Sequence, residues 1–179
     1  HRLDQVVDGT LLEGDGLIHP GGINTHIAIL STRPELNAVA HVHSIYGTAW
    51  SALNRLLPPV SAEAAVLYER HAVYDTYRDG ERENLAKAIG HNRVIIFKNH
   101  GLFTVGHSVD EAAYLFTLTE KVCQVQLTIE AAGAEPELID HEVARREAGD
   151  GFAEGDGGSG CLVGRQHGVA QRDGGGGRR

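Results

Sequence analysis

Two histidines one residue apart, His41 and His43, lie at the end of an apolar segment of the sequence. Side chains at positions i and i+2 share one face of a strand, whereas on a helix they point in different directions. Small and β-branched residues fill positions 37–43, so this segment is predicted to be extended. A third histidine, His100, follows a second apolar run. If both runs are strands of one sheet, the three imidazoles form a metal site.

Spacing alone is weak evidence for such a site. The chain has 11 histidines in 179 residues, so one His-x-His pair is close to what chance supplies. On spacing alone, hydrogen-bonded structural histidines explain the pattern as well as metal ligands do. The surrounding sequence has to decide between these two interpretations.

Composition restricts the class of protein. With 179 residues, 41% of them hydrophobic, the chain is long enough for one globular domain with a buried core. The formal net charge of -8 argues against a nucleic-acid partner, which would require a basic face. No apolar run has transmembrane length, so no membrane partner is expected. The two cysteines, Cys123 and Cys161, form no paired motif, and a reducing cytoplasm is the predicted location.

Helical and extended patterns alternate along the chain. Residues 108–111 read Ser-Val-Asp-Glu, a capping box that opens a long helix predicted to end near Ala132, before Gly133. Residues 94–97 are a continuous apolar run typical of a buried strand. This alternation predicts an α/β or α+β layered domain in which helices cover a sheet. The other expected elements are helices at about 23–31, 46–57 and 81–89 and a strand at 102–105, while 62–77 fits either type.

The two ends of the chain differ from the rest. The sequence begins with His1 and contains no methionine, so the N-terminal part of the domain is expected to be missing. Residues 134–179 are predicted to form a Gly-rich, disordered tail, because such a composition buries too little apolar surface to offset the entropy of ordering. The domain itself is expected to span residues 1–133.

Several motifs follow one another between about Leu11 and Gly133. They are His19-Pro20-Gly21-Gly22-Ile23-Asn24-Thr25-His26, Arg33-Pro34-Glu35, Ala38-Val39, His41-Val42-His43-Ser44, Lys98-Asn99-His100-Gly101-Leu102, and Gly106 with Val109, Glu111 and Ala112. In this order they resemble the class II aldolase/adducin head domain family. The resemblance implies a three-layer αβα sandwich around a central, mainly antiparallel sheet.

The same resemblance implies a metal site and an assembly. The positions that match the family's metal ligands are His41, His43 and His100, and the implied cofactor is a divalent metal, usually Zn²⁺, with Mn²⁺ as the alternative. The implied assembly is a homo-tetramer with active sites at subunit contacts. Three neutral imidazoles leave a divalent ion its positive charge and an open position for a substrate oxygen.

The implied function is a metal-dependent lyase of the class II aldolase type. It would act on a small hydroxy-carbonyl compound, either sugar-phosphate-like or a hydroxy acid, through a metal-stabilised enediolate. Aldol cleavage and decarboxylation both fit that chemistry. The alternative is a non-catalytic, adducin-like head domain that serves assembly or interaction.

One position departs from the sugar-phosphate aldolases of the family. Gly22 stands where those enzymes carry a catalytic glutamate, as is typical of the adducin-like branch. General acid or base catalysis contributes about 10²- to 10⁴-fold, so another group has to replace that carboxylate if the chain is an aldolase. Glu63 and Tyr74 are the predicted catalytic residues, from a set of candidates that also includes Tyr68 and His26. Packing is the competing interpretation for both tyrosines.

Overall fold

A four-stranded sheet forms the centre of the molecule. Its strands are β3 (Ala38–Val42), β4 (His71–Tyr74), β5 (Val94–Phe97) and β6 (Gly101–Gly106), and they lie in the order β3-β6-β5-β4. β6 pairs antiparallel with both β3 and β5, whereas β4 and β5 are parallel. The sheet is therefore mainly antiparallel, and the predicted α/β class with a mainly antiparallel sheet is confirmed.

The computed structural model describes residues 5–7, 10–13, 20–75 and 83–151. Among these residues, no helix is both long enough and apolar enough to cross a membrane. A short antiparallel hairpin, β1 (Gln5–Val7) with β2 (Thr10–Glu13), comes before the first helix in the sequence. The helices are α1 (Pro20–Thr32), α2 (Ile45–Ser51), α3 (Ala62–Val66), α5 (Glu83–Ile89), α6 (Val109–Ala131) and α7 (His141–Gly151).

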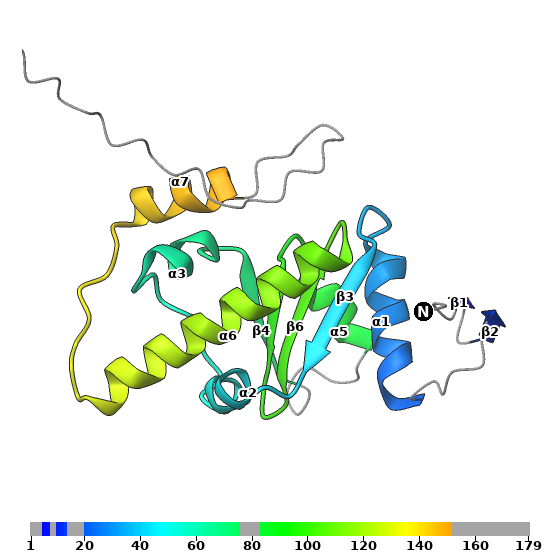
Figure 1. The fold of residues 1–179 in the computed structure, drawn as a ribbon, viewed down its shortest axis with the longest axis horizontal. Coiled ribbons are helices and arrows are strands. Elements are labelled where there is room, and N and C mark those ends of the chain that lie inside the picture. The colour runs from blue at the N-terminus through cyan, green and yellow to red at the C-terminus, as the bar shows by residue number, and fades with distance from the viewer. Residues whose placement is uncertain (1–4, 8–9, 14–19, 76–82, 152–179) are drawn as a thin grey trace, which may run out of the picture.

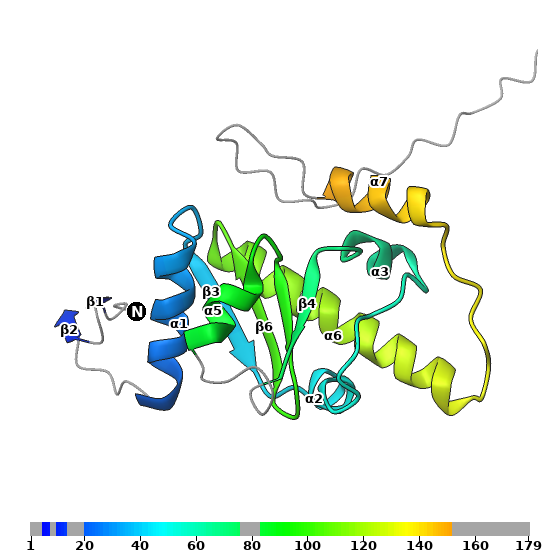
Figure 2. The same ribbon diagram turned by 180° about the vertical axis from the view of Figure 1, so that it is seen from behind.

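Helices cover both faces of the sheet. The long helix α6 crosses one face together with α2, and α1 and α5 pack on the other (Figures 1 and 2). β5 shows the consequence in its sequence, since all four of its residues are buried. Val94 and Ile96 belong to the core under α6, while Ile95 and Phe97 belong to the core under α1 and α5. A strand buried on both faces carries a continuous apolar run.

Helix α6 begins as the sequence predicts. The Ser108 hydroxyl accepts a hydrogen bond from the backbone N–H of Glu111 at 3.1 Å. The Glu111 carboxylate reaches back to the N–H of His107 at 2.6 Å, one residue earlier than in the standard capping box. The helix ends at Ala131, and Gly133 follows with a φ of +65°. Two reciprocal capping bonds thus fix the start of the longest helix.

Three segments differ from the expected elements. The helix predicted over 46–57 ends at Ser51, because Asn54 turns the chain with a φ of +52° and the Trp50 indole donates to the Arg55 carbonyl. The segment 62–77, which fits either type in the sequence, divides into α3 and β4. Within the predicted tail 134–179, the structure has the helix α7, whose Ala144 and Ala148 are buried. Residues 152–179 lie outside the described residues.

Candidate metal centre

The end of one strand and the start of its neighbour bring the three histidines together. His41 is in β3, opposite Phe103 of β6, and Val42 lies opposite Leu102. His43 follows β3 directly, and His100 directly precedes β6. Because β3 and β6 run antiparallel, the end of one lies beside the start of the other. The pairing therefore converts two distant sequence segments into one cluster.

A tight turn presents His100. Its backbone N–H donates to the carbonyl of Phe97 at 3.0 Å, and Asn99 has a φ of +54°. Gly101 has a φ of +141°, and a Cβ there would stand 2.9 Å from the Val42 carbonyl oxygen. Only glycine allows the turn to approach the end of β3 this closely. The Asn-His-Gly segment thus shapes the site as well as supplying a ligand.

The nitrogen atoms of the cluster have the spacing that a metal ion requires. One ring nitrogen of each of His41, His43 and His100 can be chosen so that all three lie within 4.8 Å of one another. The Nε2 atoms of His43 and His100 are 3.1 Å apart. Two nitrogens on a tetrahedral Zn²⁺ lie about 3.3 Å apart, from Zn–N distances of about 2.05 Å. The donor set and its spacing therefore fit a divalent ion after small adjustments.

His41 is oriented by β6 before any ion binds. Its Nδ1 lies 2.8 Å from the carbonyl oxygen of Leu102, which can only accept, so Nδ1 carries the proton and Nε2 keeps its lone pair. The ring stacks on Phe103, with centroids 3.9 Å apart and planes 4° apart. A hydrogen bond from the second ring nitrogen is the usual way to fix a metal-binding imidazole.

Burial keeps His41 in the neutral form that binds metals. The pKa of His41 is lowered from 6.5 to about 4, mainly by burial; the neighbouring His100, His43 and His26 add to this lowering, and the hydrogen bond to the Leu102 carbonyl opposes it. A ligand imidazole must be deprotonated, so His41 is ready to bind at neutral pH.

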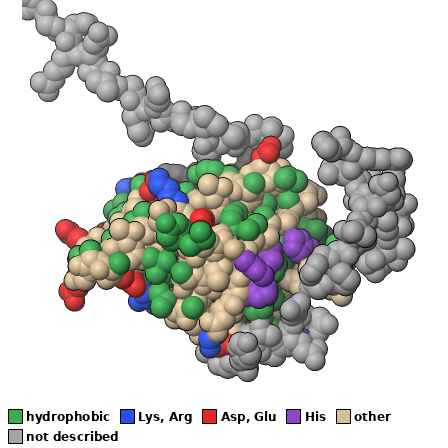
Figure 3. Space-filling view, turned by 60° about the horizontal axis from the view of Figure 1, so that its bottom comes forward, with side chains coloured by type: hydrophobic (Ala, Val, Ile, Leu, Met, Phe, Trp, Pro, Cys, Tyr) green, Lys and Arg blue, Asp and Glu red, His purple; other side chains and the backbone are tan. Residues whose placement is uncertain are grey.

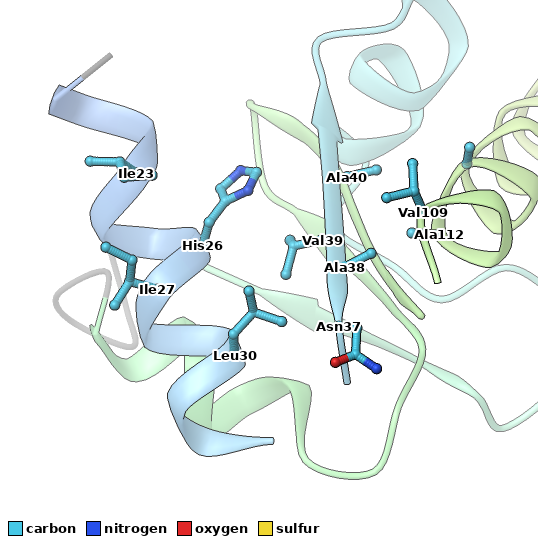
Figure 4. A pocket seen from close by; sticks show the side chains of 11 residues that line it. Ile23, His26, Ile27, Leu30, Asn37, Ala38, Val39, Ala40, Val109 and Ala112 are labelled. Atoms are coloured by element: carbon cyan, nitrogen blue, oxygen red, sulfur yellow. The ribbon is translucent and has the colours of Figure 1, made fainter. Parts of the chain in front are cut away.

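His26 lies beside the cluster and outside it. Its ring meets Phe103 edge-on with centroids 6.0 Å apart, and burial lowers its pKa. It lines a groove of about 410 Å³ between α1, β3 and α6, where Figure 4 shows its side chain pointing from α1 toward β3. Apart from His26 and Asn37, the groove is lined by apolar side chains. Phe103 contacts both His26 and His41.

The two predicted catalytic residues are not members of the histidine cluster. Glu63 is in α3, toward the other end of the sheet from the end of β3 (Figures 1 and 2), and its carboxylate pairs with Lys121. Tyr74 is 1% exposed and packs against Phe97 in the core under α1 and α5. Tyr68 contacts His141 of α7. The structure therefore does not bring Glu63 or Tyr74 into the cluster, and their catalytic roles stay predictions.

The contacts of several polar groups at the same edge of the sheet were not predicted from the sequence. Asp75 follows β4 and Lys98 follows β5, and the Lys98 ammonium donates to the Asp75 carboxylate at 2.6 Å. Parallel strands end at the same edge, which explains why these residues meet. Glu120 of α6 also reaches this region and accepts hydrogen bonds from Ser44, Tyr46 and Gly47. No local sequence pattern predicts these contacts, because the partners are 23 to 76 residues apart in the sequence.

The cluster is open to solvent. His43 is exposed, and His41 and His100 are partly exposed. Figure 3 turns the molecule so that the bottom of Figure 1 comes forward. On this face histidine side chains, coloured purple, gather at the surface. A small molecule in solution can therefore reach the nitrogen atoms.

Comparison with known proteins agrees with this architecture. The chain is 42% identical to "Decarboxylase NovR" of Streptomyces niveus over 141 residues, and the aligned region covers 75% of this chain and 51% of that protein. It is 43% identical over 150 residues to the "4-hydroxy-3-prenylphenylpyruvate oxygenase/4-hydroxy-3-prenylbenzoate synthase" of Streptomyces roseochromogenus subsp. oscitans, covering 78% and 53%. The solved structure of the L-fuculose 1-phosphate aldolase from Glaciozyma antarctica PI12 superposes with a TM-score of 0.74 at 33% identity, covering 80% of this chain and 57% of that one.

These similarities extend over three quarters or more of the chain. The chain spans about half the length of the curated relatives it matches. Residues 2–127 match the family model for the Class II Aldolase and Adducin N-terminal domain, a range that includes all three histidines and the Gly22 position. The chain therefore belongs to the class II aldolase and adducin N-terminal domain family.

Proposed function

We propose that this chain carries the metal centre of a lyase that acts on a small hydroxy-carbonyl compound. The observation that carries the proposal is the three-imidazole cluster of His41, His43 and His100, with ring nitrogens within 4.8 Å of one another. The family membership supports it, since class II aldolases are metal-dependent. Zn²⁺ is the proposed ion, with Mn²⁺ as the alternative, because imidazole is a preferred ligand of Zn²⁺, whereas Mn²⁺ favours oxygen ligands.

The protein's own residues would prepare the site in two ways. His41 offers Nε2 because its Nδ1–H is engaged by Leu102. His43 and His100 supply the remaining nitrogens from the open side of the cluster, where substrate enters. When bound, a divalent ion supplies Lewis-acid chemistry, since it polarises a substrate carbonyl and stabilises the negative charge that develops when a carbon–carbon bond breaks.

The choice between two lyase reactions depends on the missing carboxylate. Gly22 provides no general acid or base at the position where sugar-phosphate aldolases have a glutamate. Loss of CO₂ from an acid whose keto group is β to the carboxylate makes less demand on such a group, because the electron pair of the broken bond moves into that carbonyl as an enolate and no hydroxyl proton has to be removed. A relative named as a decarboxylase supports the same choice. We therefore favour an organic acid over a sugar phosphate as substrate.

A non-catalytic role in assembly is the second candidate. It is favoured by the same Gly22, which is typical of the adducin-like branch, and it leaves the histidines as a structural or inert cluster. For either role, a homo-tetramer and a cytoplasmic location are part of the proposal. The two candidates differ in whether the purified protein turns over a small molecule.

An activity screen separates the candidates. Metal-loaded protein is incubated with a panel of 3-keto acids, with and without a 2-hydroxyl group, and with L-fuculose 1-phosphate, and release of CO₂ and of aldehyde is measured. We expect CO₂ release that a chelator abolishes. His100→Ala should lower the rate by at least about 100-fold. Loss of a residue that only hydrogen-bonds to a metal ligand already lowers activity by up to about 100-fold, and loss of a ligand should have a larger effect. The exposed His91→Ala is the matched control and should leave the rate unchanged.

The outcomes of the screen are distinct. Aldehyde release without CO₂ would replace decarboxylation by aldol cleavage and keep the lyase. Equal rates with and without chelator, or an unaffected His100→Ala variant, would contradict a metal-dependent lyase. Metal binding without turnover of any compound would favour the assembly role.

A further inference from the structure

The start of α2 is capped from a distant helix. Ser44 stands at the N-cap position, but its side chain caps no backbone N–H group of α2. Instead the Glu120 carboxylate of α6 accepts from the N–H of Tyr46 at 2.9 Å and from the N–H of Gly47 at 2.6 Å. The Ser44 hydroxyl donates to the same carboxylate at 2.5 Å. The Glu120 side chain thus accepts from two N–H groups of the first turn, which have no carbonyl partner within the helix itself.

The capped turn is the segment that carries His43. His43 is the residue immediately before Ser44, at the junction of β3 and α2. His41 is fixed by the Leu102 carbonyl and by Phe103, whereas the polar and ring contacts described for the His43 imidazole are with His41 and His100 alone. The place of the His43 nitrogen in the cluster therefore depends on where its backbone is held.

The same turn packs against the strand that orients His41. A Cβ at Gly47 would stand 2.6 Å from the Leu102 Cδ1 and 2.7 Å from the Ser44 hydroxyl oxygen, so α2 approaches β6 as closely as glycine allows. Leu102 is also the residue whose carbonyl accepts from His41. Glu120 therefore closes a connected set of contacts that fixes His43 relative to His41.

We propose that Glu120 is a positioning residue of the metal centre: by anchoring Ser44, Tyr46 and Gly47, it sets the place of the His43 nitrogen and thereby the affinity for the ion. The inference rests on the proposed metal site and adds a residue from outside the ligand set. A carboxylate is required because all three partners are donors. In Glu120→Gln the amide NH₂ group, which is itself a donor, would replace one carboxylate oxygen and leave at least one of these donors without an acceptor.

The test compares cobalt binding by four proteins. Co²⁺ affinity is measured by competition with a chromophoric chelator, and the visible absorption of bound Co²⁺ reports its coordination geometry. Glu120→Gln is expected to weaken binding by about 10- to 100-fold and to change the absorption spectrum. Ser44→Ala removes one of the three hydrogen bonds and should weaken binding by less.

Glu130→Gln is the matched control. Glu130 is another glutamate of α6, and it accepts from Arg55, 75 residues away in the sequence, and from Gln126, one turn earlier in the same helix. This variant should lose stability without any change in cobalt affinity or spectrum. A purely structural role of Glu120 would give the same result for Glu120→Gln.

Each outcome decides a separate claim. Glu120→Gln with wild-type affinity and an unchanged spectrum overturns the positioning role and leaves the metal site intact. Where Glu120→Gln does not fold, Ser44→Ala decides the same question by the same readout. A folded wild-type protein that binds no cobalt overturns the metal site itself, and with it the proposed function.

Discussion

His41 is held on two sides by neighbouring residues of β6. Leu102 accepts its Nδ1–H at 2.8 Å, and Phe103 stacks on its ring. A ligand fixed in this way loses little conformational freedom when an ion binds, so more of the coordination energy appears as affinity. One of the three ligands, His41, is therefore already oriented for metal binding before an ion is present.

The turn that presents His100 gives the first residue-scale prediction. Gly101→Ala places a Cβ 2.9 Å from the Val42 carbonyl at a φ of +141°. We expect it to lower the free energy of unfolding by about 1–3 kcal/mol and to weaken metal binding, because His100 moves with the turn. Gly90→Ala is the matched control, since Gly90 also has a positive φ but no atom within 4 Å of the added Cβ.

Gly90→Ala should cost about 1 kcal/mol for its left-handed conformation and leave metal affinity unchanged. Urea unfolding and a zinc titration of both variants check this. Equal effects of the two substitutions on metal affinity would contradict the role given to the Gly101 turn.

The residues of the site differ in how far the sequence predicts them. His41, His43 and His100 stand in motifs with fixed neighbours, so their convergence is a prediction that sequence alone can make. The partners Leu102 and Glu120 are different, because they lie 61 and 73–76 positions from the groups that they hold. Only the pairing of β3 with β6 and the packing of α2 on α6 bring them close.

At the scale of elements, local signals separate the segments that were predicted well from those that were not. β5 and α6 carry strong signals, a continuous apolar run and a capping box. The helix α2 was predicted too long because apolar residues continue at helical spacing to Leu57, although Leu53 and Leu56 are exposed beyond its end. The helix α7 has few apolar residues and buries mainly small ones, Ala144 and Ala148, against α3. Tertiary contacts decide both cases.

β4 is anchored by a buried histidine that makes stability depend on pH. The Nδ1–H of His71 donates to the Leu67 carbonyl at 2.8 Å, and Nε2 accepts from the N–H of Leu57 at 2.8 Å. Burial lowers the pKa of His71 below its usual value of 6.5. As pH falls below about 6.5, the unfolded chain binds a proton at this position that the folded chain does not, so the free energy of unfolding decreases.

His71→Gln tests this dependence in metal-free protein. The variant should be less stable than wild type at pH 7.5, by about 1–3 kcal/mol for the disturbed buried hydrogen bonds. Its free energy of unfolding should fall less between pH 7.5 and pH 5 than that of wild type. His41 also has a lowered pKa but is present in both proteins, so the difference in slope belongs to His71. Parallel pH profiles in urea unfolding would show that His71 is not the group responsible.

At the scale of the whole molecule, the sheet order places the cluster at one edge of the architecture. β3 is one of the two outer strands of the described four-stranded sheet, and the histidine cluster lies between the end of β3 and the turn before β6. Alternating helical and extended patterns were enough to predict the layered fold. They did not predict the order β3-β6-β5-β4, which depends on long-range pairing that no local pattern encodes. An ion at the cluster would link the two segments and stabilise the folded state.

The central claim is that the three histidines form one metal centre, and a calorimetric titration of the metal-free protein with Zn²⁺ tests it most directly. We predict one equivalent bound per chain at neutral pH, loss of that binding in the His41→Ala/His43→Ala variant, and full binding in the exposed control His91→Ala. A folded wild-type protein that binds no zinc at micromolar concentrations, or a double variant that binds as wild type does, would contradict the account.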